Sequence, residues 1–151
     1  MQDVRQSVAA FVLRLALGTM FIAHALLKVV VFTMPGTVKF FQSVGLPGEL
    51  AYITVAAELA GGALLIAGVY TRVVALALVP ILLGALWVHA GNGWVFNAPN
   101  GGWEYPAFLA AAAIVQALLG DGAFSLGSRF FARIGSTPHA AEGRWPKPNL
   151  G

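Results

Sequence analysis

Four long apolar segments constrain this chain more than any other feature of its sequence. They run over about residues 8–31, 50–69, 73–89 and 103–119, and turn-forming residues separate them. At a rise of 1.5 Å per residue the first is roughly 36 Å long, whereas the last two lie near the lower limit of about 17 residues for a membrane-spanning helix. We therefore predict an all-α, polytopic membrane protein built as a four-helix bundle.

The composition argues against a soluble domain. Of the 151 residues, 58% are hydrophobic and only 10% are charged, and the mean hydropathy is +0.78. A soluble domain carries roughly 25% charged residues, and a chain this short could not bury so much apolar surface in its own core. The net charge of +3 is small and scattered, so no nucleic-acid partner is expected. The absence of cysteine excludes disulfides, thiol redox chemistry, iron–sulfur clusters and cysteine-zinc sites.

Lysine and arginine are distributed unevenly between the two sides of the predicted bundle. Because cytoplasmic loops carry an excess of positive residues, we expect a bacterial-type cytoplasmic (inner) membrane protein with both termini in the cytoplasm. Residues 1–134 would form the membrane domain. Residues 135–151 are rich in proline, glycine and polar residues, which predicts a disordered cytoplasmic tail. The basic side would hold Arg5, Arg72, Arg129, Arg133, Arg144 and Lys147, and the opposite side Lys39 and Lys28.

Two short helices are expected on the membrane surface. Residues 34–45 follow the first span, begin near Pro35 and end at Gly45, as helix termini often do. A second surface helix is expected over residues 129–134, after the fourth span, because apolar and basic residues fall on different faces there. The first of these helices would turn one face to the membrane, formed by Thr37, Phe40, Phe41 and Val44.

Ionisable side chains inside the spans are the first candidates for a functional site, because a charge in the hydrocarbon region is costly. Arg14 and Lys28 recur on one face of the first span, with His24 beside that face. Glu58 of the second span and His24 lie at nearly equal depth, roughly 10 to 12 Å by helical rise. We expect Glu58 to meet His24 or Lys28 across the helix pair, and Arg14 to reach it from below.

Two interpretations of this cluster remain open. One acid and two bases could form a structural ion pair between the first two helices, and Ala57, Gly61 and Gly62 beside Glu58 would permit a close approach. The same groups could instead bind a ligand or transfer protons.

A second polar and aromatic group lies between the end of the third span and the start of the fourth. An interfacial aromatic belt explains many of its members. It does not explain why His89 and Glu104 frame a loop rich in glycine and asparagine, so we also expect a polar-rimmed aromatic mouth that opens outward. The group comprises Trp87, His89, Asn92, Trp94, Phe96, Asn97, Asn100, Trp103, Glu104 and Tyr105.

From both groups we select the candidate site. Glu58 and His89 are the candidates for catalysis, and no metal site is expected from the scattered histidines and methionines. The candidate ligand-binding residues are Arg14, His24, Lys28, Glu58, Trp87, His89, Trp103 and Glu104.

Seven short motifs follow one another over about residues 12–126. They are Arg14-Leu-Ala-Leu-Gly18, His24 to Lys28, Gly45-Leu-Pro-Gly, Glu58-Leu-Ala-Gly-Gly62, Gly68-Val-Tyr-Thr-Arg72, Gly101-Gly-Trp-Glu-Tyr-Pro106 and Gly120-Asp-Gly-Ala-Phe-Ser-Leu126. Taken in order, these motifs resemble those of the DoxX family. The family usually has an acidic residue where this chain has Gly127, so no role is expected at that position. The resemblance implies a relation to the large subunit of a membrane thiosulfate:quinone oxidoreductase.

The expected function is that of a redox-associated subunit that binds a quinone or similar aromatic small molecule in the outer half of the bundle. If it is an enzyme, it would be a quinone-linked oxidoreductase subunit. No tightly bound cofactor is expected, and quinone is the candidate ligand. The alternative is a non-catalytic structural or assembly subunit of a larger respiratory or redox complex. The expected partners are the lipid bilayer and other membrane subunits or further copies of the chain.

Overall fold

The computed structural model describes residues 2–127, which form helices joined by short connections and contain no strand. The all-α prediction is therefore confirmed. The second predicted surface helix, at residues 129–134, and the predicted tail, at residues 135–151, lie outside the described residues. The elements are α1 (Gln2–Leu26), the π-helical turn η1 (Leu27–Val31), α2 (Met34–Ser43), α3 (Glu49–Ala67), α4 (Thr71–His89), the 3-10 turn η2 (Ala90–Asn92) and α5 (Glu104–Leu119).

Three stretches of the described chain are long and apolar enough to cross a membrane: Val4–Val31, Glu49–Ala67 and Thr71–Asn92. The fourth, α5, has 16 residues and is apolar but shorter. Its length of about 24 Å falls below the roughly 30 Å of the hydrocarbon core. All four predicted spans correspond to helices; the first begins six residues earlier than predicted, and the other bounds differ by at most two residues once η1 is counted with α1.

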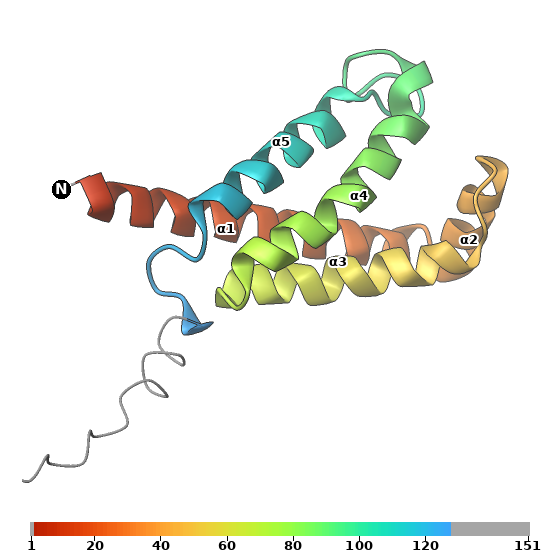
Figure 1. Cartoon of the computed structure of the whole chain (residues 1–151). Helices are drawn as coiled ribbons and strands as arrows, with labels where there is room; N and C mark the ends of the chain where they lie inside the picture. Colours follow the sequence, from red (N-terminus) through yellow and green to blue (C-terminus); the bar gives the residue numbers. More distant parts are fainter. Residues whose placement is uncertain (1, 128–151) are drawn as a thin grey trace, which may run out of the picture.

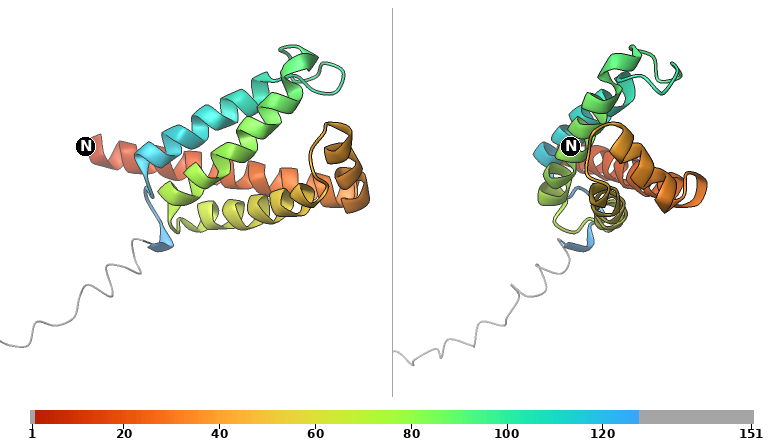
Figure 2. Two further views of the ribbon diagram at one scale, coloured as in Figure 1. Left: turned by 45° about the vertical axis from the view of Figure 1, so that its right-hand side comes forward. Right: turned by 90° about the vertical axis from the view of Figure 1, so that its right-hand side faces the viewer.

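The four long helices form two antiparallel pairs, α1 with α3 and α4 with α5. The pairs also touch each other through α3 with α4 and α1 with α5, so the contacts close into a ring. Figures 1 and 2 show that the α4–α5 pair diverges from the α1–α3 pair toward the end of the bundle that carries α2. We call this end, with α2 and residues 90–103, the open end. The opposite end, with residues 68–71 and 120–127, is the closed end.

A close backbone contact holds α1 against α3. A Cβ atom on Gly18 would lie 2.7 Å from the carbonyl oxygen of Gly62, and one on Gly62 would lie 2.8 Å from the carbonyl oxygen of Gly18. These distances are too short for a side chain, so both positions require glycine. Gly61 faces α4 instead, where a Cβ would meet the Leu78 side chain at 2.8 Å. The expected close approach of the first two helices is thus found at Gly62.

The short helix predicted after the first span is present as α2, but the face that was expected against the membrane turns toward the bundle. Thr33 caps it by accepting a hydrogen bond from the Gly36 amide at 3.3 Å, and Pro35 lies in its first turn. Thr37 is buried, and its hydroxyl donates to the Lys28 carbonyl of the π-helical turn at 2.9 Å. This bond fastens α2 to the end of α1.

Candidate functional site

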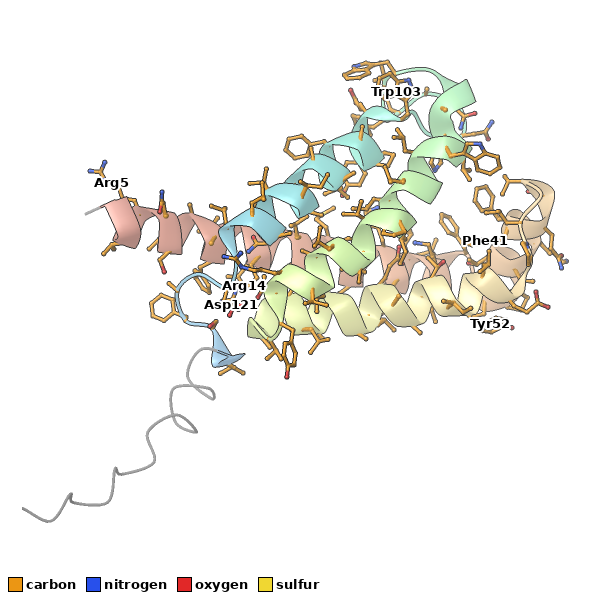
Figure 3. The ribbon with its side chains drawn as sticks, viewed as in Figure 1. Arg5, Arg14, Phe41, Tyr52, Trp103 and Asp121 are labelled. Carbon is orange, nitrogen blue, oxygen red and sulfur yellow. The ribbon has the colours of Figure 1, made fainter. Side chains whose placement is uncertain are left out.

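A pocket of about 460 Å³ lies at the open end, between the two diverging helix pairs. Its volume is within the range of about 300 to 1,000 Å³ that is usual for small-molecule sites. Residues of α1, α2, α3, α4 and α5 all contribute to its lining, which is mostly apolar and includes Phe21, Phe41, Ile53, Leu82 and Leu109. Figure 3 shows Phe41 on the side of α2 that faces the rest of the bundle. The polar residues of the lining are His24, Lys28, Thr54, Glu58, His89 and Tyr105.

The Lys28 and Glu58 side chains form an ion pair in this pocket. The Lys28 ammonium lies 2.8 Å from both carboxylate oxygens of Glu58, so two of its three N–H groups are used. The Glu58 side chain is 6% exposed and that of Lys28 is 20% exposed. Pairing is what makes two charges tolerable in so apolar a place. Of the two partners predicted for Glu58 across the helix pair, His24 and Lys28, the structure shows Lys28.

His24 lies one helical turn before Lys28 on the same pocket wall. Its Nδ1 atom is 2.8 Å from the Met20 carbonyl oxygen, so its own helix orients the ring. The ring stacks on that of Tyr105 from α5, with centroids 5.4 Å apart and planes at 24°. The Tyr105 hydroxyl is buried and has no hydrogen-bond partner among the described residues. The His24 and Tyr105 rings thus join the two helix pairs across the pocket.

His89 lies at the end of α4 and lines the same pocket. Its Nδ1 atom is 3.0 Å from the Asn100 carbonyl oxygen and 3.2 Å from that of Gly101. The Asn92 amide nitrogen also donates to the Asn100 oxygen, at 3.1 Å. These bonds hold the loop between α4 and α5 against the end of α4, so the loop positions the His89 ring.

The aromatic residues of that loop form a second pocket of about 450 Å³. The Glu104 carboxylate accepts a hydrogen bond from the Phe96 amide at 2.9 Å, and this bond closes the loop on itself. Trp103 packs edge-on against Trp94, with ring centroids 4.5 Å apart. The lining is Trp94, Phe96, Glu104, Tyr105, Ala107 and Phe108, of which Tyr105 also lines the larger pocket.

Arg14 lies at the closed end, away from the pocket. Its guanidinium is fully buried and donates to the Ile66 carbonyl at 3.2 Å and to the Ala123 carbonyl at 2.9 Å. In Figure 3 it lies beside Asp121. The expectation that Arg14 reaches Glu58 is wrong, because carbonyls of the α3 end and of residues 120–127 hold its side chain at this end.

The surroundings of Arg14 indicate a structural role. A Cβ on Gly68 would collide with its guanidinium, so this glycine leaves the space that the arginine fills. Asp121 accepts a hydrogen bond from the Thr71 amide at 3.3 Å, and Gln116 donates to the Gly120 carbonyl at 2.8 Å. The polar groups around Arg14 therefore tie the turn between α3 and α4 and the segment after α5 to α1.

The structure brings four of the eight predicted ligand-binding residues together in the larger pocket: His24, Lys28, Glu58 and His89. Glu104 lines the neighbouring pocket. Arg14, Trp87 and Trp103 line neither, and Trp87 is 63% exposed. Sequence reasoning did not select Thr54, Tyr105 or the phenylalanines of α2 for the site. The one available signal for Thr54 was its position one turn before Glu58 on the same helix.

Comparison with known proteins shows which family and which relative this chain is similar to. The model of the DoxX family matches residues 9–91, more than half of the chain. A protein of Bacillus subtilis (strain 168) described as "Putative oxidoreductase CatD" is 39% identical over 79 residues, which cover 52% of this chain and 58% of that relative. The match therefore spans little more than half of the relative's length. No solved structure matches the chain. With its apolar helices and this family match, the chain is a membrane protein that belongs to the DoxX family.

Proposed function

We propose that this protein binds a quinone or a similar aromatic small molecule in the pocket at the open end. The observation that carries the proposal is the Lys28–Glu58 ion pair, which lies in an otherwise largely apolar pocket of about 460 Å³. A few polar groups in an apolar cavity are typical of small-molecule sites. The description of the Bacillus relative as an oxidoreductase is consistent with a redox-active ligand.

Each part of the pocket has a role in this proposal. Aromatic side chains such as Phe41 and Tyr105 would pack against the ligand ring. The third N–H of Lys28, which Glu58 does not use, would donate to a ring oxygen. Glu58 or His89 would accept or supply protons when the ring changes oxidation state. The electrons would come from a partner protein or a second substrate.

The test is binding of a short-tailed benzoquinone and of its hydroquinone to the purified protein in detergent, with Glu58→Gln as the variant. The substitution removes the charge that holds Lys28 in place, so we expect affinity to fall by about tenfold or more. Glu49→Gln is the matched control, since this glutamate is exposed in the first turn of α3 and lies outside the pocket. Equal affinity of wild type and Glu58→Gln for both probes, or no binding of either probe by the wild type, overturns the proposal.

A second candidate is a non-catalytic subunit of a larger membrane complex. The observation that favours it is that Lys28 already satisfies both oxygens of Glu58, as a purely structural pair would. Purification in a gentle detergent discriminates between the two. A stoichiometric enzyme partner without bound ligand supports the assembly role, whereas an isolated homo-oligomer that carries quinone contradicts it.

We also propose that the closed end faces the cytoplasm, which places the pocket in the outer half of a cytoplasmic membrane. Among the described basic residues, Arg5 and Arg72 belong to helix ends on that side, and Lys39 belongs to α2 at the open end. Since the chain has no cysteine, single-cysteine variants report orientation cleanly. In intact cells a membrane-impermeant maleimide should label Asn97→Cys but not Gln6→Cys, and the reverse pattern would refute the orientation.

A further inference from the structure

The two histidines of the pocket turn the same ring nitrogen toward the backbone. The Nδ1 atom of His24 is 2.8 Å from the Met20 carbonyl oxygen, and that of His89 is 3.0 Å from the Asn100 carbonyl oxygen. A carbonyl oxygen can only accept a hydrogen bond, so both Nδ1 atoms carry the proton. The Asn92 amide nitrogen lies 3.4 Å from the Nδ1 atom of His89, farther than the carbonyl oxygens of Asn100 and Gly101 at 3.0 and 3.2 Å. The two nearer acceptors therefore decide the assignment.

This assignment determines what each ring can offer a ligand. A neutral imidazole that is protonated at Nδ1 has a lone pair on Nε2 and can only accept there. Within residues 4–127, no hydrogen bond to the Nε2 atom of His24 or His89 is observed. Both histidines line the pocket, and the Nε2 atom of each is the hydrogen-bond acceptor that it could offer a ligand there. The carboxylate of Glu58 can only accept hydrogen bonds, so it adds to the number of acceptors in the pocket.

Donors are fewer than acceptors in the pocket. Lys28 has one N–H left after it pairs with both oxygens of Glu58. The hydroxyls of Thr54 and Tyr105 can donate or accept, so they do not discriminate between ligands. The polar lining therefore favours a ligand that brings hydrogen-bond donors with it.

A ring hydroxyl satisfies these groups better than a ring carbonyl does. The two side chains that flank one wall, His24 and Lys28, are four residues apart and so are neighbours on the helix. A hydroxyl oxygen can accept from Lys28 while its hydrogen is donated to the Nε2 atom of His24. A carbonyl oxygen can accept from Lys28 only, and it would place its lone pair against that of His24. His89, at the end of α4, provides a second acceptor, which could bind a second hydroxyl of the ligand.

We propose that His24 and His89 act as hydrogen-bond acceptors that make the pocket selective for a hydroxylated, reduced aromatic ring over the corresponding quinone. The inference rests on the proposed function, because it names the form of the ligand that the same pocket prefers. It assigns both histidines to ligand specificity.

The experiment compares three probes on the wild-type protein under anaerobic conditions: a short-tailed hydroquinone, its dimethyl ether and the parent benzoquinone. The ether keeps the ring and both oxygens but has no hydrogen to donate. We expect the hydroquinone to bind about tenfold or more tightly than either of the others, which is the effect of one buried hydrogen bond. This comparison uses the wild-type protein alone, so it gives a result even if a variant does not fold.

The variant His24→Phe keeps an aromatic ring against Tyr105 and removes the Nε2 acceptor. We expect it to lose about tenfold in hydroquinone affinity and to bind benzoquinone and the ether as the wild type does. Tyr52→Phe is the control: Tyr52 is exposed on α3 and lies outside the pocket, so this substitution should leave the affinity for all three probes unchanged.

The possible outcomes separate this inference from the proposed function. If benzoquinone binds as tightly as the hydroquinone, or if His24→Phe weakens all three probes equally, the acceptor role is refuted while ligand binding in the pocket stands. If none of the three probes binds to the wild type, the proposed function fails and this inference fails with it.

Discussion

The contact between Gly18 and Gly62 gives the sharpest prediction about stability. In Gly62→Ala, the new Cβ would lie 2.8 Å from the Gly18 carbonyl oxygen and 2.8 Å from the Ile22 side chain. The side chain can rotate, but the carbonyl belongs to the α1 backbone and moves only with the helix. To reach an ordinary carbon–oxygen distance of about 3.3 Å, α1 and α3 must separate by roughly 0.5 Å.

The magnitude follows from the cost of overpacking. Extra volume in a well-packed interface costs about 1 to 3 kcal/mol, and here the alanine also disrupts the approach on which small-residue helix contacts depend. Gly84 in α4 is the matched control, because a Cβ there would meet nothing within 4 Å. Gly84→Ala is expected to be neutral or to stabilise the helix by up to about 1 kcal/mol.

The assay is reversible unfolding of both variants in mixed micelles with increasing SDS, followed by far-ultraviolet circular dichroism and tryptophan fluorescence. Gly62→Ala should lower the free energy of unfolding by about 1 to 3 kcal/mol while Gly84→Ala does not. If both variants have the same unfolding midpoint, the contact between α1 and α3 has room for a Cβ atom at position 62, and the reasoning is refuted.

Three further predictions concern the polar groups around Arg14 and the Lys28–Glu58 ion pair, and the same unfolding assay checks each. Gly68→Ala should destabilise the protein by at least about 2 kcal/mol, because φ is +69° and the Cβ would displace the Arg14 guanidinium. Arg14→Met should cost about 2 to 4 kcal/mol through the loss of two bonds to carbonyls, with no change in ligand affinity; a selective loss of affinity would return Arg14 to the site. Lys28→Met should cost about 3 to 5 kcal/mol by leaving Glu58 unpaired, and the double variant with Glu58→Met should recover most of it; if the two effects simply add, the pair is not coupled.

Helical periodicity was enough to predict the elements and one side of the pocket. The apolar runs and their turn residues give the long helices within about six residues. The spacing of Phe40 and Phe41 places them on one face of α2, but this face was expected against the membrane and instead lines the pocket. Depth along a helix also predicts that Glu58 meets His24 or Lys28, and the structure shows Lys28. These successes share one cause: each depends on residues of the same helix, or on two long helices that follow each other with only α2 between them.

The fate of Arg14 could not be predicted in this way. Its position on α1 gave its depth, but its partners are decided by residues 120–127, which return to the start of the bundle after α5. The bond from Arg14 to the Ala123 carbonyl joins residues 109 positions apart. Nothing in the local pattern distinguishes an arginine that reaches up toward Glu58 from one that backbone carbonyls hold at the other end.

The aromatic residues of the open end divide for a similar reason. Periodicity grouped Trp87, Trp103 and Tyr105 at one level, but only Tyr105 turns inward to stack on His24. Trp87 lies on an exposed face of α4, and Trp103 packs within the loop. Which of these rings enters the pocket depends on how far the two helix pairs diverge, and that angle is a property of the packed bundle.

The two ends of the bundle differ in what lies between the helix pairs. At the closed end, Arg14 joins the middle of α1 to the end of α3 and to the segment after α5. At the open end, aromatic side chains from α2 and from the start of α5 lie between the pairs. The α1–α3 pair supplies Lys28, Glu58 and His24, whereas the other pair supplies His89 and Tyr105. A ligand that contacts both sets would join the two pairs at the end where they diverge, so its binding energy would act directly on the angle between them.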